Sequence, residues 1–207
     1  WESEKQIDDL KQLLSDCRKA GFSHALLLGM GGSSLAPEVL RLINGLQGLD
    51  LSILDSTNPD EVLAAQKRIP LDKTLFIVAS KSGTTGEINA FYQYFWKLAQ
   101  SEFGVEAGKH FIAITDPDTK LAKLAKENDF WKIFIADPKV GGRNSALTAF
   151  GLVPAALVGF DIASFLKKAQ LAAESCRISK VISSNPGVVL GVLLAEAAKN
   201  GKDKLTL

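Results

Sequence analysis

The 207-residue sequence is poor in several features that mark particular classes of protein. Its two cysteines, Cys17 and Cys176, lie far apart without a partner at metal-binding spacing, so we predict neither a disulfide scaffold nor a metal site. Free thiols of this kind fit a reducing, cytoplasmic location. The apolar stretches at 150–160 and 188–195 are too short to cross a bilayer, and we expect no membrane partner.

An excess of charge of one sign is also missing. Lys and Arg number 24 against 23 Asp and Glu, so no basic field attracts nucleic acid, and we expect no nucleic-acid partner. A small anion would have to be captured by a local site. The sequence starts at Trp1 with neither an initiator Met nor an apolar signal segment, and we expect it to be a piece of a longer protein.

Short apolar runs alternate with helical patterns over the first two thirds of the sequence. The runs predict five strands, at 25–28, 51–54, 75–79, 111–115 and 133–136. Apolar residues at helical spacing predict helices at 3–20, 35–44, 59–68, 86–103 and 119–127. This alternation predicts the α/β class, with a doubly wound, five-stranded parallel sheet in the flavodoxin-like order 2-1-3-4-5.

After Arg143 the pattern changes to helices without strands. These helices are predicted at 147–158, 162–179 and 186–199. We therefore expect three parts: an N-terminal helix at 1–22, an α/β domain at 23–160 and a helical extension at 161–207.

Three of the predicted strands end in polar loops that contain glycine. The loops are Gly29–Ser34, Ser80–Thr85 and Val140–Ser145. Parallel strands bring these loops to one edge of the sheet, and the reversal of strand order places the first two around one crevice. The Ser80–Thr85 loop has four hydroxyls and a glycine before a helix N-terminus, which favours the binding of a phosphate group. Capping of that helix would explain only one or two of the hydroxyls.

Other residues near these loops have two interpretations each. Gly29 and Gly31 with a later Asp55 partly match a dinucleotide-binding motif, but Ser34 stands where the third glycine is required. Arg143 offers a forked, permanent cation for an anion, although an arginine in a surface loop is the commoner case.

Glu87 lies in the first turn of the helix after the Ser80–Thr85 loop, where it could act in the site or only complement the helix dipole. His24 and His110 precede strands, which places both at the opposite edge of the sheet. We expect neither histidine to be catalytic.

Together the three loops resemble those of the sugar isomerase, or SIS, domain of the glucose-6-phosphate isomerase family. The likeness is carried by Gly29–Ser33 (GMGGS), Ser80–Thr85 (SKSGTT) and Val140–Ser145 (VGGRNS). It continues in Gly151–Leu157 and Gly201–Leu207, and so extends over nearly the whole chain.

The resemblance implies an activity, the isomerisation of glucose 6-phosphate and fructose 6-phosphate through an enediolate, in glycolysis and gluconeogenesis and without a cofactor. The residues implied to contact the sugar phosphate are Gly32, Ser33, Ser80, Lys81, Ser82, Thr85 and Gly142. Arg143 is implied to stabilise the enediolate, as a fixed positive charge against developing negative charge. Glu87 matches an acidic residue of the family and is implied to orient catalytic partners.

The resemblance also implies that catalytic groups are missing. The family's glutamate base, ring-opening histidine and late lysine belong to a second SIS domain and C-terminal region, after the point where Leu207 ends this sequence. Because proton transfer needs a positioned base, we expect the chain alone to bind sugar phosphate without isomerising it.

For the full-length protein the resemblance implies a homodimer. Ser82 and Gly83 replace a Thr-Phe pair of animal-type members, which is similar to bacterial short or transaldolase-fused isomerases and leaves a transaldolase fusion open. The alternative function is a non-catalytic SIS sensor of sugar phosphates. The arginine loop favours the enzyme, because a sensor needs no stabiliser for an enediolate.

Overall fold

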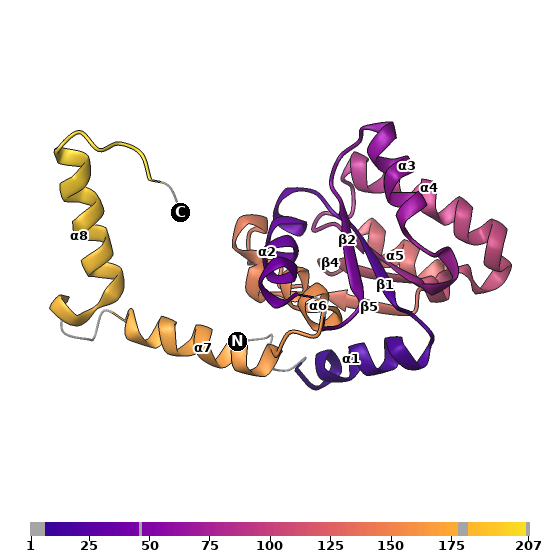
Figure 1. Ribbon diagram of the computed structural model, residues 1–207, viewed down its shortest axis with the longest axis horizontal. Coiled ribbons are helices and arrows are strands. Elements are labelled where there is room, and N and C mark those ends of the chain that lie inside the picture. Colours follow the sequence, from indigo (N-terminus) through magenta and orange to yellow (C-terminus); the bar gives the residue numbers. More distant parts are fainter. Residues whose placement is uncertain (1–6, 46, 178–181, 206–207) are drawn as a thin grey trace. The chain divides into compact units, whose positions relative to one another are not determined.

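The computed structural model describes residues 7–45, 47–177 and 182–205 (Figure 1). The chain divides into two compact units, with the boundary between Ile162 and Ala163. The start of the helix predicted at 3–20 and the end of the helix predicted at 162–179 lie outside the described residues.

A five-stranded, all-parallel sheet forms the centre of the first unit (Figure 1). The strands are β1 His24–Leu28, β2 Asp50–Leu54, β3 Thr74–Ala79, β4 Phe111–Thr115 and β5 Lys132–Ile135. Their order, β2-β1-β3-β4-β5, confirms the predicted class and topology. Every residue of β3 and β4 is buried, because helices cover both faces of the sheet there.

Six helices of the first unit form the two outer layers (Figure 1). One layer holds α3 Pro59–Arg68, α4 Gly86–Phe103 and α5 Lys120–Glu127. The other holds α1 Ile7–Lys19, α2 Leu35–Asn44 and α6 Ala149–Leu157. The helices predicted at 35–44, 59–68 and 86–103 are confirmed to the residue.

Side-chain caps fix where several helices begin. Asn58 accepts a hydrogen bond from the Asp60 amide at 3.0 Å, and Thr119 accepts one from the Ala122 amide at 3.1 Å. Thr148 caps α6 in the same way, so that α6 starts two residues later than predicted. The residues before it, Gly142–Leu147, form a 3₁₀ helix instead.

The core between the sheet and α4 is largely aromatic. Phe76, Phe95 and Phe111 are fully buried, and the rings of Phe76 and Phe111 stack with their centroids 4.9 Å apart. Burial of a phenylalanine side chain stabilises a fold by about 1.5–3 kcal/mol. This layer therefore holds β3 and α4 firmly on either side of the loop that joins them.

The second unit is helical and contains α8, Pro186–Lys199, preceded by most of α7, Ile162–Ser175. Asn185 begins α8 by accepting hydrogen bonds from the amides of Gly187 and Val188. Large apolar side chains of α8 are exposed, with Leu193 at 62%. In the described part of the chain, no helix combines the length and apolar character needed to cross a bilayer.

His110 lies at the amino-terminal edge of the sheet, as predicted, and packs in an aromatic cluster. Its ring stacks on Phe103 with 3.8 Å between centroids, and Phe22 meets it edge-on at 5.2 Å. Burial lowers the pKa of His110 below its usual value, and a contact with the Thr74 carbonyl oxygen opposes that shift only in part.

This arrangement makes folding sensitive to acid. Because the pKa of His110 is lower in the folded chain than in the unfolded chain, its stabilising contribution is present above about pH 6.5 and is lost as the pH falls through the folded pKa. We expect the free energy of unfolding, measured with urea, to decline below that pH less steeply in His110→Phe than in the wild type. Equal slopes would show that this histidine is not the cause.

Candidate functional site

The three polar loops meet at the carboxyl-terminal edge of the sheet, around an open cleft of about 400 Å³. Seven residues singled out from the sequence line it: Gly32, Ser33, Ser80, Lys81, Ser82, Thr85 and Gly142. Met30, Ala79, Ile88 and Asp116 complete the lining. The fold thus brings together residues as distant in the sequence as Met30 and Gly142.

The Ser80–Thr85 loop is held by its own hydroxyls. The buried Ser80 Oγ accepts a hydrogen bond from the Gly83 amide at 3.1 Å and lies 3.1 Å from Thr85 Oγ1. Since one hydrogen serves the Ser80–Thr85 pair, the second hydroxyl hydrogen of that pair is left for a ligand. Ser82 Oγ accepts from the amide and hydroxyl of Thr84, which likewise leaves the hydrogen of Ser82 to donate.

The start of α4 adds backbone donors. Thr85 occupies the N-cap position, but its side chain makes no capping hydrogen bond. Capping of α4 therefore does not account for the Thr85 hydroxyl. The first amides of a helix have no acceptor within the helix, and they carry the positive end of its dipole. Gly86, Glu87 and Ile88 supply such amides beside the hydroxyls of the loop, which is the donor arrangement that binds a phosphate.

The β1 loop and the loop after β5 form the opposite wall of the cleft. Their backbones touch at Gly32 and Gly142, so closely that a Cβ built on Gly32 would lie 2.5 Å from the Gly142 carbonyl oxygen. Ser145 joins them, because its hydroxyl lies 2.6 Å from the Gly142 carbonyl oxygen and 3.2 Å from that of Gly32. The hydroxyl of Ser33 in this wall has no protein partner among the described residues.

Two predicted catalytic residues stand outside the lining. Arg143 and Glu87 are both exposed, and neither lines the cleft. Each is the sequence neighbour of a lining residue, because Arg143 follows Gly142 and Glu87 precedes Ile88. The structure therefore places their backbones at the rim of the cleft.

Asp116 is a cleft residue that belongs to none of the three polar loops. Its carboxylate accepts a hydrogen bond from Lys81 Nζ at 2.5 Å, and Lys81 also donates to the Pro138 carbonyl oxygen at 3.1 Å. Asp116 directly follows β4, and β4 is the neighbour of β3 in the sheet. Its place after a parallel strand, at the same sheet edge as the Ser80–Thr85 loop, is the feature of the sequence that could have indicated it.

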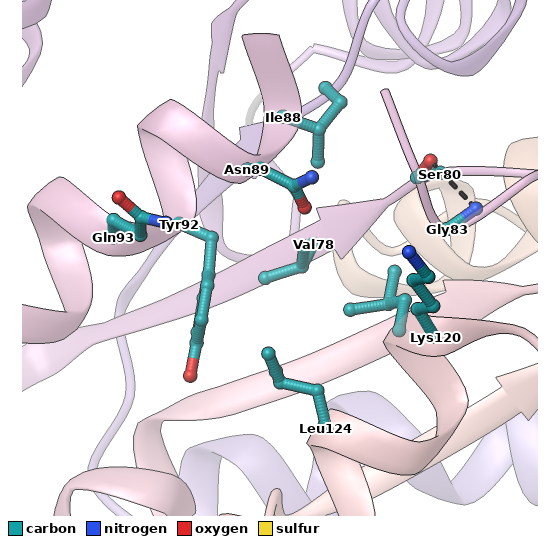
Figure 2. A pocket seen from close by; sticks show the side chains of 10 residues that line it. Val78, Ser80, Gly83, Ile88, Asn89, Tyr92, Gln93, Lys120 and Leu124 are labelled. Atoms are coloured by element: carbon teal, nitrogen blue, oxygen red, sulfur yellow. Dashed lines mark hydrogen bonds between the residues drawn. The ribbon is translucent and has the colours of Figure 1, made fainter. Parts of the chain in front are cut away.

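A second, smaller pocket of about 230 Å³ lies between α4 and α5, behind the Ser80–Thr85 loop (Figure 2). Its floor is apolar, with Val78, Tyr92 and Leu124, and burial raises the pKa of the Tyr92 phenol. Figure 2 shows the ammonium group of Lys120 pointing toward the hydrogen bond between Ser80 and Gly83. No motif in the sequence indicates this pocket, because it depends on how the two helices pack.

Thiols and acidic groups do not form a further centre in the described residues. Cys17 is buried, and burial raises the pKa of its thiol to about 12, so that it stays protonated at neutral pH. Cys176 is exposed. Within residues 7–45, 47–177 and 182–205, no three His, Cys, Asp or Glu side chains gather as metal ligands would.

Known proteins are similar to this chain in fold and in sequence. A solved structure described as a putative phosphosugar isomerase from Silicibacter pomeroyi shares the fold, with a TM-score of 0.51 at 18% identity, over 86% of this chain and 54% of that one. A hypothetical protein of Thermus thermophilus has a TM-score of 0.87 at 28% identity, over 94% of this chain and 46% of the other. These likenesses define the fold class: a doubly wound α/β domain of the fold found in a protein described as a putative phosphosugar isomerase.

Sequence comparison gives the particular family. The sequence profile of phosphoglucose isomerase matches residues 15–195, and the chain belongs to this family. The glucose-6-phosphate isomerase of Carboxydothermus hydrogenoformans is 32% identical over 95% of this chain, and that of Cyanothece sp. is 34% identical over 90%. The chain spans 45% and 36% of the lengths of these two relatives.

Proposed function

We propose that this chain is the sugar-phosphate-binding domain of a glucose-6-phosphate isomerase and that the cleft holds the phosphate of glucose 6-phosphate or fructose 6-phosphate. The observation that supports this most directly is the set of donors at one end of the cleft. Hydroxyl hydrogens from the Ser80–Thr85 pair and from Ser82 converge there with the first amides of α4. Ser33 adds a hydroxyl from the facing wall.

The sugar would extend from this phosphate along the wall formed by Gly32 and Gly142. In this pose Arg143, attached next to Gly142, stabilises the negative charge of the enediolate as a proton moves between C1 and C2. Glu87, in the first turn of α4, orients the groups that act on the sugar. We assign the binding site to residues 23–160, with 1–22 and 161–207 as flanking helical parts.

The catalytic base is proposed to lie outside these 207 residues. The cleft lining contains one carboxylate, that of Asp116, and it is already paired with Lys81. A base must reach the proton that it removes, so the chain alone is proposed to bind sugar phosphate without isomerising it. Relatives that are roughly twice as long or more have additional chain in which such a base could lie.

An apolar stripe on α2 supports the proposal that the full-length protein is a homodimer. Leu35, Val39, Leu42 and Ile43 lie on one side of this helix and are 54–71% exposed. Contiguous exposed apolar side chains of this kind mark surfaces that other protein segments cover. Sedimentation of the full-length protein tests this assignment.

Removal of the Thr85 hydroxyl tests the binding proposal. In Thr85→Val we expect fructose 6-phosphate to bind about tenfold or more weakly by calorimetry, because a hydrogen bond to a charged group contributes about 1.5–3 kcal/mol. The thermal midpoint should fall only slightly, because Thr85 makes no capping bond and Ser80 Oγ, which loses its contact with Thr85, still accepts from the Gly83 amide. Thr84→Val is the matched control, because the Thr84 hydroxyl hydrogen is already used within the loop.

The results separate the two parts of the proposal. Equal affinity in Thr85→Val and the wild type, or binding of NAD in place of fructose 6-phosphate, would contradict the site. Conversion of glucose 6-phosphate to fructose 6-phosphate by the purified chain would contradict the absence of the base while leaving the site in place.

A further inference from the structure

The charged groups of the cleft are already paired with each other. Of the described residues that line it, Lys81 and Asp116 carry charges, and their side chains form an ion pair at 2.5 Å. The pair is substantially buried, with side-chain exposures of 30% for Lys81 and 15% for Asp116. The cleft lining therefore has a formal net charge of zero, although its hydroxyls and amides are arranged for an anion.

The pair also determines where the Lys81 ammonium group lies. Lys81 Nζ is held between Asp116, at the end of β4, and the Pro138 carbonyl oxygen, after β5. The backbones agree with this placement, because the Asp116 amide donates to the Lys81 carbonyl oxygen at 3.3 Å. Lys81 thus bridges the ends of three neighbouring strands.

One oxygen of Asp116 is not compensated. Asp116 Oδ1 is buried and has no hydrogen-bond partner in the described part of the chain. A buried carboxylate oxygen without a donor is unfavourable, and a bridge between strands does not need it. The charge of Asp116 balances the ammonium charge of Lys81 in the lining of the cleft, which points to a role in the electrostatics of the site.

We propose that Asp116 is a positioning and specificity-determining residue for the phosphate site. It fixes Lys81 Nζ at the edge of the cleft and offsets its charge, so that the site selects ligands by their fit to neutral donors and not by charge alone. A sugar phosphate that reaches the facing wall at Gly32 and Ser33 is then favoured over a bare inorganic anion. This inference rests on the proposed function of the cleft.

A substitution that removes the charge of Asp116 distinguishes this role from a structural one, because the two roles predict opposite changes in phosphate affinity. Asp116→Asn keeps an oxygen that can accept from Lys81 and changes the net charge of the lining from zero to +1. We expect inorganic phosphate to bind this variant roughly three- to thirtyfold more tightly than the wild type at low salt. The ratio of the affinity for fructose 6-phosphate to that for inorganic phosphate should therefore be smaller in this variant than in the wild type. A residue that only stabilised the loop would give weaker binding instead.

A second variant tests positioning separately from charge. Asp116→Ala removes the same charge but also removes the acceptor that holds Lys81 Nζ. We expect this variant to bind inorganic phosphate about threefold or more weakly than Asp116→Asn, because an unheld lysine must be ordered when the ligand binds. Equal affinities of the two variants would contradict the positioning role.

The wild type provides a measurement that does not depend on whether a variant folds. A cleft of zero net charge predicts that the affinity for inorganic phosphate falls by less than about threefold between 20 and 500 mM NaCl. A steep salt dependence, or Asp116→Asn binding no more tightly than the wild type at an unchanged thermal midpoint, would overturn the proposal for Asp116. Failure of the wild type and both variants to bind any sugar phosphate would instead contradict the function of the cleft.

Discussion

Replacing Gly32 by alanine is expected to weaken fructose 6-phosphate binding by about tenfold or more and to destabilise the fold by about 1–3 kcal/mol. The added Cβ would lie 2.5 Å from the Gly142 carbonyl oxygen and 2.6 Å from its carbonyl carbon, well inside van der Waals contact. Both contacts are to backbone, so one loop must move away from the other. Because Ser145 joins these two loops, the displacement should open the whole wall of the cleft.

Gly141→Ala is the matched control for this change. Gly141 lies in the same pair of loops, but a Cβ there meets no heavy atom within 4 Å, and its φ of −65° suits alanine. We expect this variant to stay within about 0.5 kcal/mol of the wild type in urea unfolding. Calorimetry measures the affinity of both variants for fructose 6-phosphate. Equal affinities would show that the contact between the loops does not shape the site.

Gly83→Ala is expected to destabilise the fold by roughly 2–4 kcal/mol and to reduce phosphate binding with it. Two effects add here. The φ of +66° is left-handed, which an alanine adopts at an energetic cost, and the Cβ would lie 2.8 Å from Thr119 Cβ and 2.9 Å from the Leu121 amide nitrogen. Displacing Gly83 would also break the hydrogen bond from its amide to Ser80 Oγ, on which the donor geometry depends.

Gly21→Ala separates the two effects. Gly21 also has a positive φ, of +90°, at the end of α1, but a Cβ there would meet nothing within 4 Å. We expect this variant to lose only the conformational part, about 1–2 kcal/mol, by urea denaturation. If Gly83→Ala were no less stable than Gly21→Ala, the packing of the phosphate loop against the start of α5 would contribute nothing.

The sequence was sufficient for most of the fold because its signals are local. Continuous apolar runs such as Leu75–Ala79 identify strands that are buried on both faces, and alternation with helices constrains the sheet to a parallel, doubly wound form. Helix starts at Pro59 and Gly86 follow from residue types within a few positions. The predicted start of α6 was wrong by two residues. The apolar pattern extends to Leu147, but Thr148 caps the helix and the residues before it form a 3₁₀ helix.

The site was predictable in its residues but not in its contacts. Motifs identified seven lining residues, because hydroxyls and glycines that cluster at the carboxyl ends of parallel strands are typical of ligand sites. The sequence alone did not predict the pairing of Lys81 with Asp116 or the joining of Gly32 and Gly142 by Ser145. These contacts span 35 and 113 positions and depend on how loops from different strands pack together.

The central claim is that the Ser80–Thr85 loop and the first turn of α4 hold the phosphate of a sugar phosphate. A titration of the isotopically labelled 207-residue chain with fructose 6-phosphate, followed by amide chemical shifts, tests it most directly. We predict saturable shifts at residues 82–88 and at Ser33, and none of them with fructose. Shifts confined to the pocket between α4 and α5, around Gln93 and Lys120, or equal shifts with fructose, would contradict the claim.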